Sequence, residues 1–289
     1  MKLLLLGPNG QLGSDIRRAC AGRSDIEVIP IGRGTLDVSR VDAIGSILAE
    51  IAFDALVNCT SYHKTDEVER SASQAFAINA HAVREMAEAC RARRAKFFHI
   101  STDYVFDGTK LSPYTENDCP RPINAYGASK AMGEKLAELE YDDLYVLRVA
   151  SLFGVAGASG KGGNFVETML RLAREKGEVR VVDDIVMSPT GTADVADMIL
   201  RLIDRVAAPG VYHAVNGGHA SWFEFARAIL AGAGSKATAT ALTSAQFPTI
   251  ARRPAYSVLD NAKLCAAIGP VPDWQDALRR YLKQKGHVH

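Results

Sequence analysis

The 289-residue sequence predicts an α/β fold with a doubly wound parallel sheet, followed by a smaller C-terminal domain. Short apolar runs alternate with longer amphipathic segments through the first half of the chain. These runs are continuously apolar, which is typical of parallel strands buried on both faces. Right-handed crossovers between such strands place helices on both sides of the sheet.

Residues 1–150 are expected to form the first domain. Its predicted strands are Lys2–Leu6, Ile26–Ile31, Ala55–Asn58, Lys96–Ser101 and Leu144–Arg148. The helices predicted between them are Gly13–Ala21, Val41–Ile51, Ala72–Arg93 and Ala125–Glu140.

The regular alternation of strands and helices weakens after residue 150. The chain also exceeds the length at which a single hydrophobic core usually stops growing. We therefore expect residues 151–289 to form a substrate-binding domain, with some elements returning to the first. Its predicted helices lie near Phe165–Lys176, Thr192–Val206, Trp222–Gly232 and Trp274–Lys283. Short strands are predicted at Val179–Val182 and Val211–Ala214.

Composition excludes several classes of protein. A net charge of +1 argues against a nucleic-acid or membrane-surface partner. The apolar run Leu3–Leu6 is far shorter than the ~20 residues of a membrane helix. Five cysteines without a CxxC pair suggest neither a disulfide framework nor a zinc site, and the histidines lack ligand spacing. We expect a cytoplasmic protein without a metal.

A glycine-rich turn follows the first strand directly. Gly7 would allow the tight turn, Gly10 would let a pyrophosphate approach backbone N–H groups, and Gly13 would bring the helix close to the sheet. The spacing is GxxGxxG rather than GxGxxG, and glycines also serve simple turns. Its place between a strand and a helix favours a Rossmann-like dinucleotide site.

Arg33 follows the second strand, where an acidic residue would hold the ribose 2′-hydroxyl of NAD. A guanidinium there can bind the 2′-phosphate of NADP, so NADPH is the expected cofactor and NADH remains possible. The alternative is a solvated loop arginine. Asp37 and Val38 could contact the adenine.

Tyr126 and Lys130 are four residues apart in a predicted helix and therefore share a face. A neighbouring ammonium favours the phenolate, so we expect it to lower the pKa of the tyrosine for acid–base work. Such pairs also arise by chance on exposed helices. Ser101 and Thr102 end a predicted strand, where open α/β sheets bind ligands, and a hydroxyl there can contact a substrate carbonyl.

Together these features resemble an extended short-chain dehydrogenase/reductase. The run Ser101-Thr-Asp-Tyr-Val-Phe-Asp-Gly108 resembles more specifically the dTDP-4-dehydrorhamnose reductase family. Val57-Asn-Cys-Thr-Ser-Tyr62, Pro122-Ile-Asn-Ala-Tyr-Gly-Ala-Ser-Lys130 and Arg253-Pro254 continue the likeness, which spans nearly the whole chain.

The resemblance implies hydride transfer from a nicotinamide to the C4 ketone of a nucleotide-linked 4-keto-6-deoxy-sugar. Thr102 would orient the carbonyl, Tyr126 would protonate the alkoxide, and Lys130 would tune Tyr126 and hold the ribose. The implied cofactor contacts further include Gly10, Gln11, Leu12, Ser61 and Tyr62. The implied substrate contacts are Thr102, Asp103, Tyr104, Ser151 and Arg253, the last as a partner for phosphates.

Departures from the family leave the substrate open. Ser151 stands where the family usually has a tryptophan against the substrate, while Trp222 and Trp274 are interpreted as packing residues. One alternative is a nucleotide-sugar epimerase or dehydratase. Another is a catalytically silent NADP-binding regulatory subunit, like that of methionine adenosyltransferase. Helix 72–93 could also form a homodimer interface.

Overall fold

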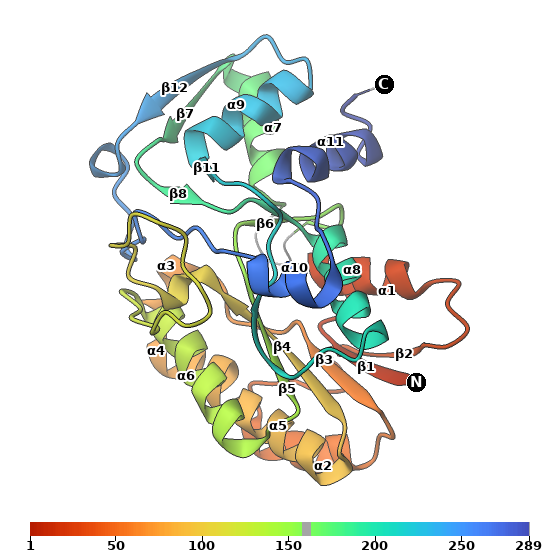
Figure 1. Cartoon of the computed structure of the whole chain (residues 1–289). Coiled ribbons are helices and arrows are strands. Elements are labelled where there is room, and N and C mark those ends of the chain that lie inside the picture. Colours follow the sequence, from red (N-terminus) through yellow and green to blue (C-terminus); the bar gives the residue numbers. More distant parts are fainter. Residues whose placement is uncertain (158–162, 289) are drawn as a thin grey trace.

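The computed structural model describes residues 1–157 and 163–288, and a six-stranded parallel sheet forms its centre (Figure 1). The strand order is β10-β5-β4-β3-β1-β2, which confirms the predicted doubly wound, Rossmann-like sheet. The strands are β1 (Lys2–Leu6), β2 (Glu27–Ile31), β3 (Ala55–Asn58), β4 (Lys96–Thr102), β5 (Leu144–Val149) and β10 (Gly210–His213).

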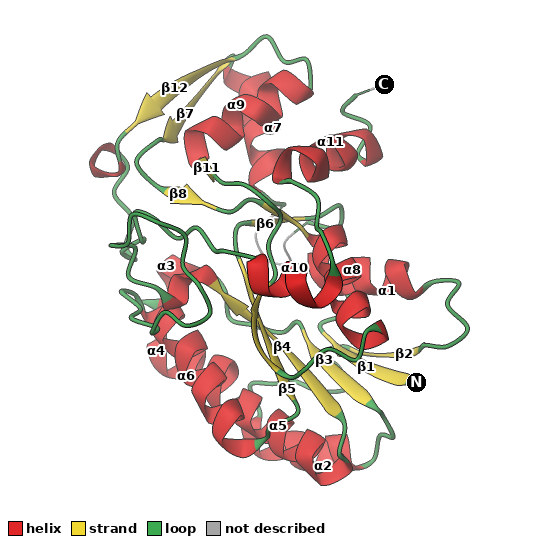
Figure 2. Ribbon diagram, viewed as in Figure 1, coloured by secondary structure: helices red, strands yellow, loops and turns green. Residues whose placement is uncertain are grey.

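Both faces of this sheet are covered by helices (Figure 2). Leu3 and Leu5 pack into one core with α1 (Gln11–Cys20) and α8 (Thr192–Asp204). Leu4 and Leu6 pack into another with α2 (Val41–Ala49) and α5 (Ala82–Arg93), beside which lies α6 (Ala125–Glu140). Since alternate residues of β1 enter opposite cores, the strand has to be apolar throughout.

The single helix predicted over 72–93 is interrupted. It consists of α4 (Ala72–Phe76), the π-helical turn η1 (Ala77–His81) and α5. Asn79 lies in this turn, where its side chain accepts from Tyr62 N (2.8 Å) and donates to Tyr62 O (3.0 Å). A π turn adds a single residue to a segment that stays helical on both sides, so the helical pattern of the sequence did not reveal it.

The C-terminal part packs α7 (Phe165–Lys176), α9 (Trp222–Gly232) and α11 (Trp274–Gln284) around a separate core. β7 (Glu178–Val182) pairs in parallel with β12 (Thr238–Leu242). β12 was not predicted because it is short and mostly exposed, so the sequence carries little pattern there. β10 and α8 come from this half of the sequence but join the central sheet and its helical layer.

Shorter elements connect the two parts. They are α3 (Thr65–Val68), η2 (Asp103–Val105), β6 (Leu152–Phe153), β8 (Val186–Met187), β9 (Thr190–Gly191), β11 (Ala220–Ser221), η3 (Ser244–Gln246) and α10 (Ala262–Ile268). Within residues 1–157 and 163–288, no helix is both long and apolar enough to cross a bilayer.

Candidate active site

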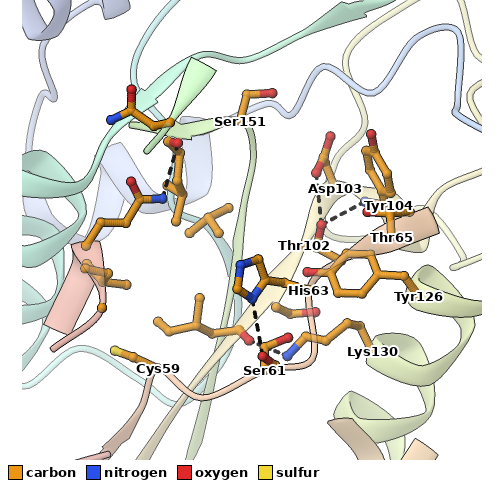
Figure 3. Close-up of a pocket in the computed structure, with 18 of the residues that line it drawn as sticks. Cys59, Ser61, His63, Thr65, Thr102, Asp103, Tyr104, Tyr126, Lys130 and Ser151 are labelled. Atoms are coloured by element: carbon orange, nitrogen blue, oxygen red, sulfur yellow. Dashed lines mark hydrogen bonds between the residues drawn. The ribbon is translucent and has the colours of Figure 1, made fainter. Parts of the chain in front are cut away.

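A cavity of about 470 Å³ lies at the carboxyl ends of the central strands (Figure 3). Its walls come from the turn after β1, the segments after β3, β4 and β5, and helices α6, α7 and α9. The predicted site residues that line it are Gly10, Gln11, Leu12, Gly13, Ser61, Thr102, Asp103, Tyr104, Tyr126, Lys130, Ser151 and Arg253.

Other predicted cofactor residues are not among its described lining residues: Gly7, Arg33, Asp37, Val38 and Tyr62. Gly7 shapes the turn itself, with φ of 74°. Arg33 is exposed just beyond β2 and forms an ion pair with Asp37 (Nε to Oδ2, 3.0 Å). The backbone of Tyr62 is hydrogen-bonded through its N–H and its C=O to the side chain of Asn79.

The turn after β1 is built for a close approach between backbones. A Cβ at Gly13 would lie 2.2 Å from Gly7 O, so α1 can start here only with glycine at this position. Gly10 precedes α1 without capping it through a side chain, which leaves helix N–H groups available for an anion. Gln11 Oε1 is buried, with no hydrogen-bond partner among the described residues. These features fit the pyrophosphate and nicotinamide portions of a dinucleotide.

Thr102 and Asp103 form a buried polar pair at the end of β4. Thr102 Oγ1 donates to Asp103 Oδ1 (3.0 Å) and accepts from Tyr104 N (3.2 Å). Ser257 Oγ donates to Asp103 Oδ2 (2.6 Å). Burial raises the pKa of Asp103 to about 6, although these hydrogen bonds oppose the shift. The hydrogen bonds to Asp103 and Tyr104 N fix the Thr102 hydroxyl at the cavity wall.

Tyr126 and Lys130 both project from α6 toward the cavity, with Tyr126 beside Thr102 (Figure 3). Burial raises the pKa of Tyr126 to about 12, while hydrogen bonding with Thr102 and Ser61 lowers it. The expected net lowering of this pKa by Lys130 is therefore wrong in this structure, because desolvation of the phenolate dominates. A phenol with this pKa stays protonated at neutral pH, as a proton donor must.

Lys130 is also buried, and its Nζ lies 3.1 Å from His99 Nε2 and donates to Ile100 O (2.6 Å). Burial lowers the pKa of Lys130 to about 8, and the nearby Glu134 carboxylate opposes this shift. Burial therefore shifts the pKa of each partner toward its neutral form.

The start of α6 is fixed by several contacts. Asn124 caps the helix by accepting from Gly127 N (2.7 Å), and it donates to Arg252 O (2.8 Å). A Cβ at Gly127 would lie 2.0 Å from Tyr104 O, so glycine allows the helix to lie against the segment after β4. These contacts fix the orientation of Tyr126 relative to Thr102.

The cavity wall also contains an aromatic pair that was not predicted as part of the site. Phe165 opens α7 and Trp222 opens α9, with ring centroids 4.6 Å apart, and both line the cavity. The packing interpretation of Trp222 was thus incomplete, whereas Trp274 is buried in the core as expected. Ser101, expected beside Thr102 at the strand end, lines the cavity as well. Further lining residues not assigned to the site from the sequence are Cys59, Thr60, His63, Thr65, Ile100, Val149, Leu152, Gly163, Asn164 and Thr168.

Arg253 and Ser151 also line the cavity. Arg253 pairs with Asp66 (Nη2 to Oδ2, 3.1 Å) and lies 3.5 Å from the Tyr104 hydroxyl. Ser151 has a φ of 45°, a left-handed conformation that is uncommon for a residue with a side chain. The cavity thus combines a glycine turn at a helix N-terminus, a hydroxyl and a phenol, an aromatic pair and a basic side chain.

Residues 1–286 match the model of the RmlD substrate binding domain. The chain belongs to this family. A dTDP-4-dehydrorhamnose reductase from Burkholderia thailandensis is 37% identical, over 96% of this chain and 97% of the relative. A dTDP-4-keto-6-deoxy-D-glucose reductase from Streptomyces niveus is 34% identical, over 95% of this chain and 94% of the relative.

A solved structure agrees with this membership. Crystalline dTDP-4-dehydrorhamnose reductase from Bacillus anthracis, in complex with NADP, has a TM-score of 0.92 and 34% identity, covering 98% of this chain and 99% of that one. The family expected from the Ser101–Gly108 run is confirmed, and the chain is an NAD(P)H-dependent oxidoreductase of the extended short-chain type.

Proposed function

We propose that this chain is an NADPH-preferring reductase of the C4 ketone of a nucleotide-linked 4-keto-6-deoxy-sugar, in deoxysugar biosynthesis of the dTDP-rhamnose type. One observation carries the proposal: Thr102, Tyr126 and Lys130 line the same cavity as the uncapped N-terminus of α1. A dinucleotide with its pyrophosphate at that helix would extend toward the hydroxyl and the phenol.

The cofactor end of the cavity is assigned to Gly10, Gln11, Leu12 and Gly13, which would hold the pyrophosphate and its ribose. When bound, a reduced nicotinamide supplies the hydride. Arg33, exposed beyond β2, would bind a 2′-phosphate, and its present partner Asp37 is itself held by Ser39 (Oγ to Oδ1, 2.8 Å). This geometry supports the preference for NADPH.

The chemical step is assigned to two groups of this chain. Thr102 Oγ1 would donate a hydrogen bond to the substrate carbonyl, exchanging its present acceptor Asp103 for the substrate oxygen. Tyr126, kept protonated by burial, would donate its proton to that oxygen as it gains negative charge. Lys130, on the same face of α6, would hold the ribose and influence the proton on Tyr126.

The substrate contacts are assigned to other lining residues of the same cavity. Arg253 would pair with the diphosphate of the nucleotide, since a guanidinium matches phosphate oxygens well. The related reductases from Burkholderia thailandensis and Streptomyces niveus bear names of different dTDP-linked 4-keto sugars, which supports the substrate class but not one sugar. Ser151 and Trp222 also line the cavity, so the choice of sugar would depend on them.

The deciding experiment is turnover of a panel of 4-keto-6-deoxy-sugar nucleotides with NADPH and with NADH, followed by the reduced-nicotinamide absorbance. The proposal expects oxidation of NADPH with at least one dTDP-linked ketone. Tight NADPH binding without turnover on any sugar would favour the regulatory-subunit alternative. Sugar conversion without net oxidation of the nicotinamide would favour an epimerase or dehydratase.

A further inference from the structure

His99 lies behind the Tyr126–Lys130 face as a fully buried imidazole on β4, outside the residues assigned to the reaction above. Its Nε2 lies 3.1 Å from Lys130 Nζ, and its Nδ1 lies 3.2 Å from Asn58 Nδ2 at the end of β3. The ring therefore bridges the strand under the cofactor turn and the helix that carries Lys130.

The orientation of the Asn58 amide is fixed by the backbone. Thr60 N donates to Asn58 Oδ1 at 2.9 Å, and a backbone N–H can only donate. The oxygen of the amide must therefore face Thr60, which leaves the Nδ2 amino group facing His99. Because this amino group also only donates, His99 Nδ1 must be the acceptor.

A neutral imidazole has one acceptor nitrogen and one N–H. With Nδ1 accepting, the proton lies on Nε2 and points at Lys130 Nζ. An ammonium has no lone pair to accept it, whereas a neutral amine has one. Lys130 can accept this N–H and still donate to Ile100 O at 2.6 Å, so the contacts are satisfied by the amine.

We propose that His99, held by Asn58 as the Nε2–H tautomer, is a positioning residue that donates to Lys130 Nζ and favours its neutral form. The consequence for catalysis rests on the proposed reductase function: after Tyr126 has given its proton to the substrate oxygen, the Lys130 ammonium would pass one proton to the phenolate and become the neutral amine that His99 favours. The tautomer and the titration of Lys130 do not depend on that function.

The other groups around Lys130 are consistent with this assignment. Glu134 on α6 favours the ammonium, but its own carboxylate is paired with Arg148 (2.7 Å). Cys59 after β3 remains a neutral thiol because burial raises its pKa to about 12. Burial lowers the pKa of His99 well below its usual value, so the ring stays neutral. Burial lowers the pKa of Lys130, which is the direction that the proposal requires.

The tautomer can be measured directly in the intact, cofactor-free protein. Long-range 1H–15N spectra of uniformly 15N-labelled protein distinguish Nε2–H, Nδ1–H and the imidazolium. The His99 signals are identified by their absence in His99→Gln. We expect the neutral Nε2–H tautomer at neutral pH. Either the Nδ1–H tautomer or an imidazolium would overturn the proposal.

Asn58→Asp tests the link to Lys130. The carboxylate keeps an acceptor for Thr60 N and offers a second one to His99 Nδ1, so the ring should switch to Nδ1–H. Nε2 then accepts from the Lys130 ammonium. The titration midpoint of Lys130, followed by the 13Cε signal and assigned with Lys130→Arg, should rise by about one pH unit or more, a tenfold change in acidity. An unchanged midpoint would contradict the proposal.

The same substitution in a variant without the His99 ring distinguishes the effect of the ring from the effect of the new carboxylate charge. In His99→Leu, Asn58→Asp can act on Lys130 only through its charge, so its effect on the midpoint should be clearly smaller. An equal shift in both backgrounds would overturn the role of His99, and if the double variant does not fold, the wild-type tautomer decides. If the protein is an active reductase but His99 is the Nδ1–H tautomer, the inference about His99 is wrong and the proposed function stands. If His99 and Lys130 behave as expected but no sugar nucleotide is turned over, the proposed function is wrong and the inference about His99 stands.

Discussion

The carboxylate of Glu134 is buried against Arg148, with 2.7 Å between Oε2 and Nη2. Arg148 Nε adds contacts of 3.1 and 3.2 Å to the two carboxylate oxygens, and Ser101 Oγ donates to the same group. The pair ties α6 to β5 and β4. It thus fixes the helix that presents Tyr126 and Lys130 to the strand end that carries Thr102.

Glu134→Gln should destabilise the fold strongly. Loss of one partner leaves the buried Arg148 charge without its counter-ion, which typically costs about 3–5 kcal/mol of unfolding free energy. Denaturant unfolding of the two proteins measures the difference. The control is Glu138→Gln on the same helix, an exposed pair with Lys135, which should change stability by less than about 0.5 kcal/mol. Similar values for both variants would contradict the role of the buried pair.

Tyr126→Phe should remove the proton donor while keeping the ring in place. Loss of a general acid lowers kcat by roughly 10²–10⁴-fold. NADPH binding, measured by fluorescence titration, should persist because the glycine turn is untouched. Tyr141→Phe is the control, since it ends the same helix away from the cavity. Wild-type turnover in Tyr126→Phe would exclude the phenol as donor.

Arg33→Ala should weaken NADPH more than NADH. The side chain is 82% exposed, so it can leave its ion pair with Asp37 and turn toward a 2′-phosphate. Loss of a charge-assisted contact of about 1.4 kcal/mol corresponds to a tenfold rise in the Michaelis constant for NADPH. Arg17→Ala, in the last turn of α1, serves as the control. Equal effects of Arg33→Ala on both cofactors would refute the 2′-phosphate assignment.

Much of the first half of the fold could be predicted because its strands are buried on both faces. Ala125–Glu140 is predicted with the bounds that the structure gives, and Asn124 caps its first turn. The π turn at Asn79 escaped prediction because its signal is a tertiary contact with Tyr62 rather than a change of pattern. Short strands such as β6 are formed by two residues each and carry no periodicity.

In the site, too, the residues that could be predicted are those marked by sequence spacing, and those placed by tertiary packing could not be. Tyr126, Lys130 and Thr102 could be identified from spacing and from the place of strand ends. Trp222 could not, because its position in the wall depends on how α9 packs against Phe165 from α7. The pKa of Tyr126 was misjudged because a sequence shows the neighbouring Lys130 but not the burial that outweighs it.

Gly127→Ala should damage both the fold and the site. The added Cβ would lie 2.0 Å from Tyr104 O, and this backbone oxygen cannot move away without shifting the segment after β4. Overpacking of this kind costs about 1–3 kcal/mol, and the displaced Tyr126 should lower turnover further. Gly45→Ala in α2 is the control, as no described heavy atom lies within 4 Å of its added Cβ. It should gain about 0.5–1 kcal/mol. Equal stability of the two variants would refute the close approach.

Asp103→Asn should change how stability depends on pH. Burial raises the pKa of Asp103 from 3.8 to about 6, so the folded protein binds this proton more tightly than the unfolded chain. Stability therefore falls as the pH rises between these two values, by on the order of 3 kcal/mol. Asparagine does not ionise, so the variant should lack this part of the decline. Urea unfolding of both proteins at several pH values between 4 and 7 measures it, with Asp142→Asn on the surface as the control. If Asp103→Asn keeps the full wild-type decline, Asp103 ionises in the folded protein as readily as in the unfolded chain.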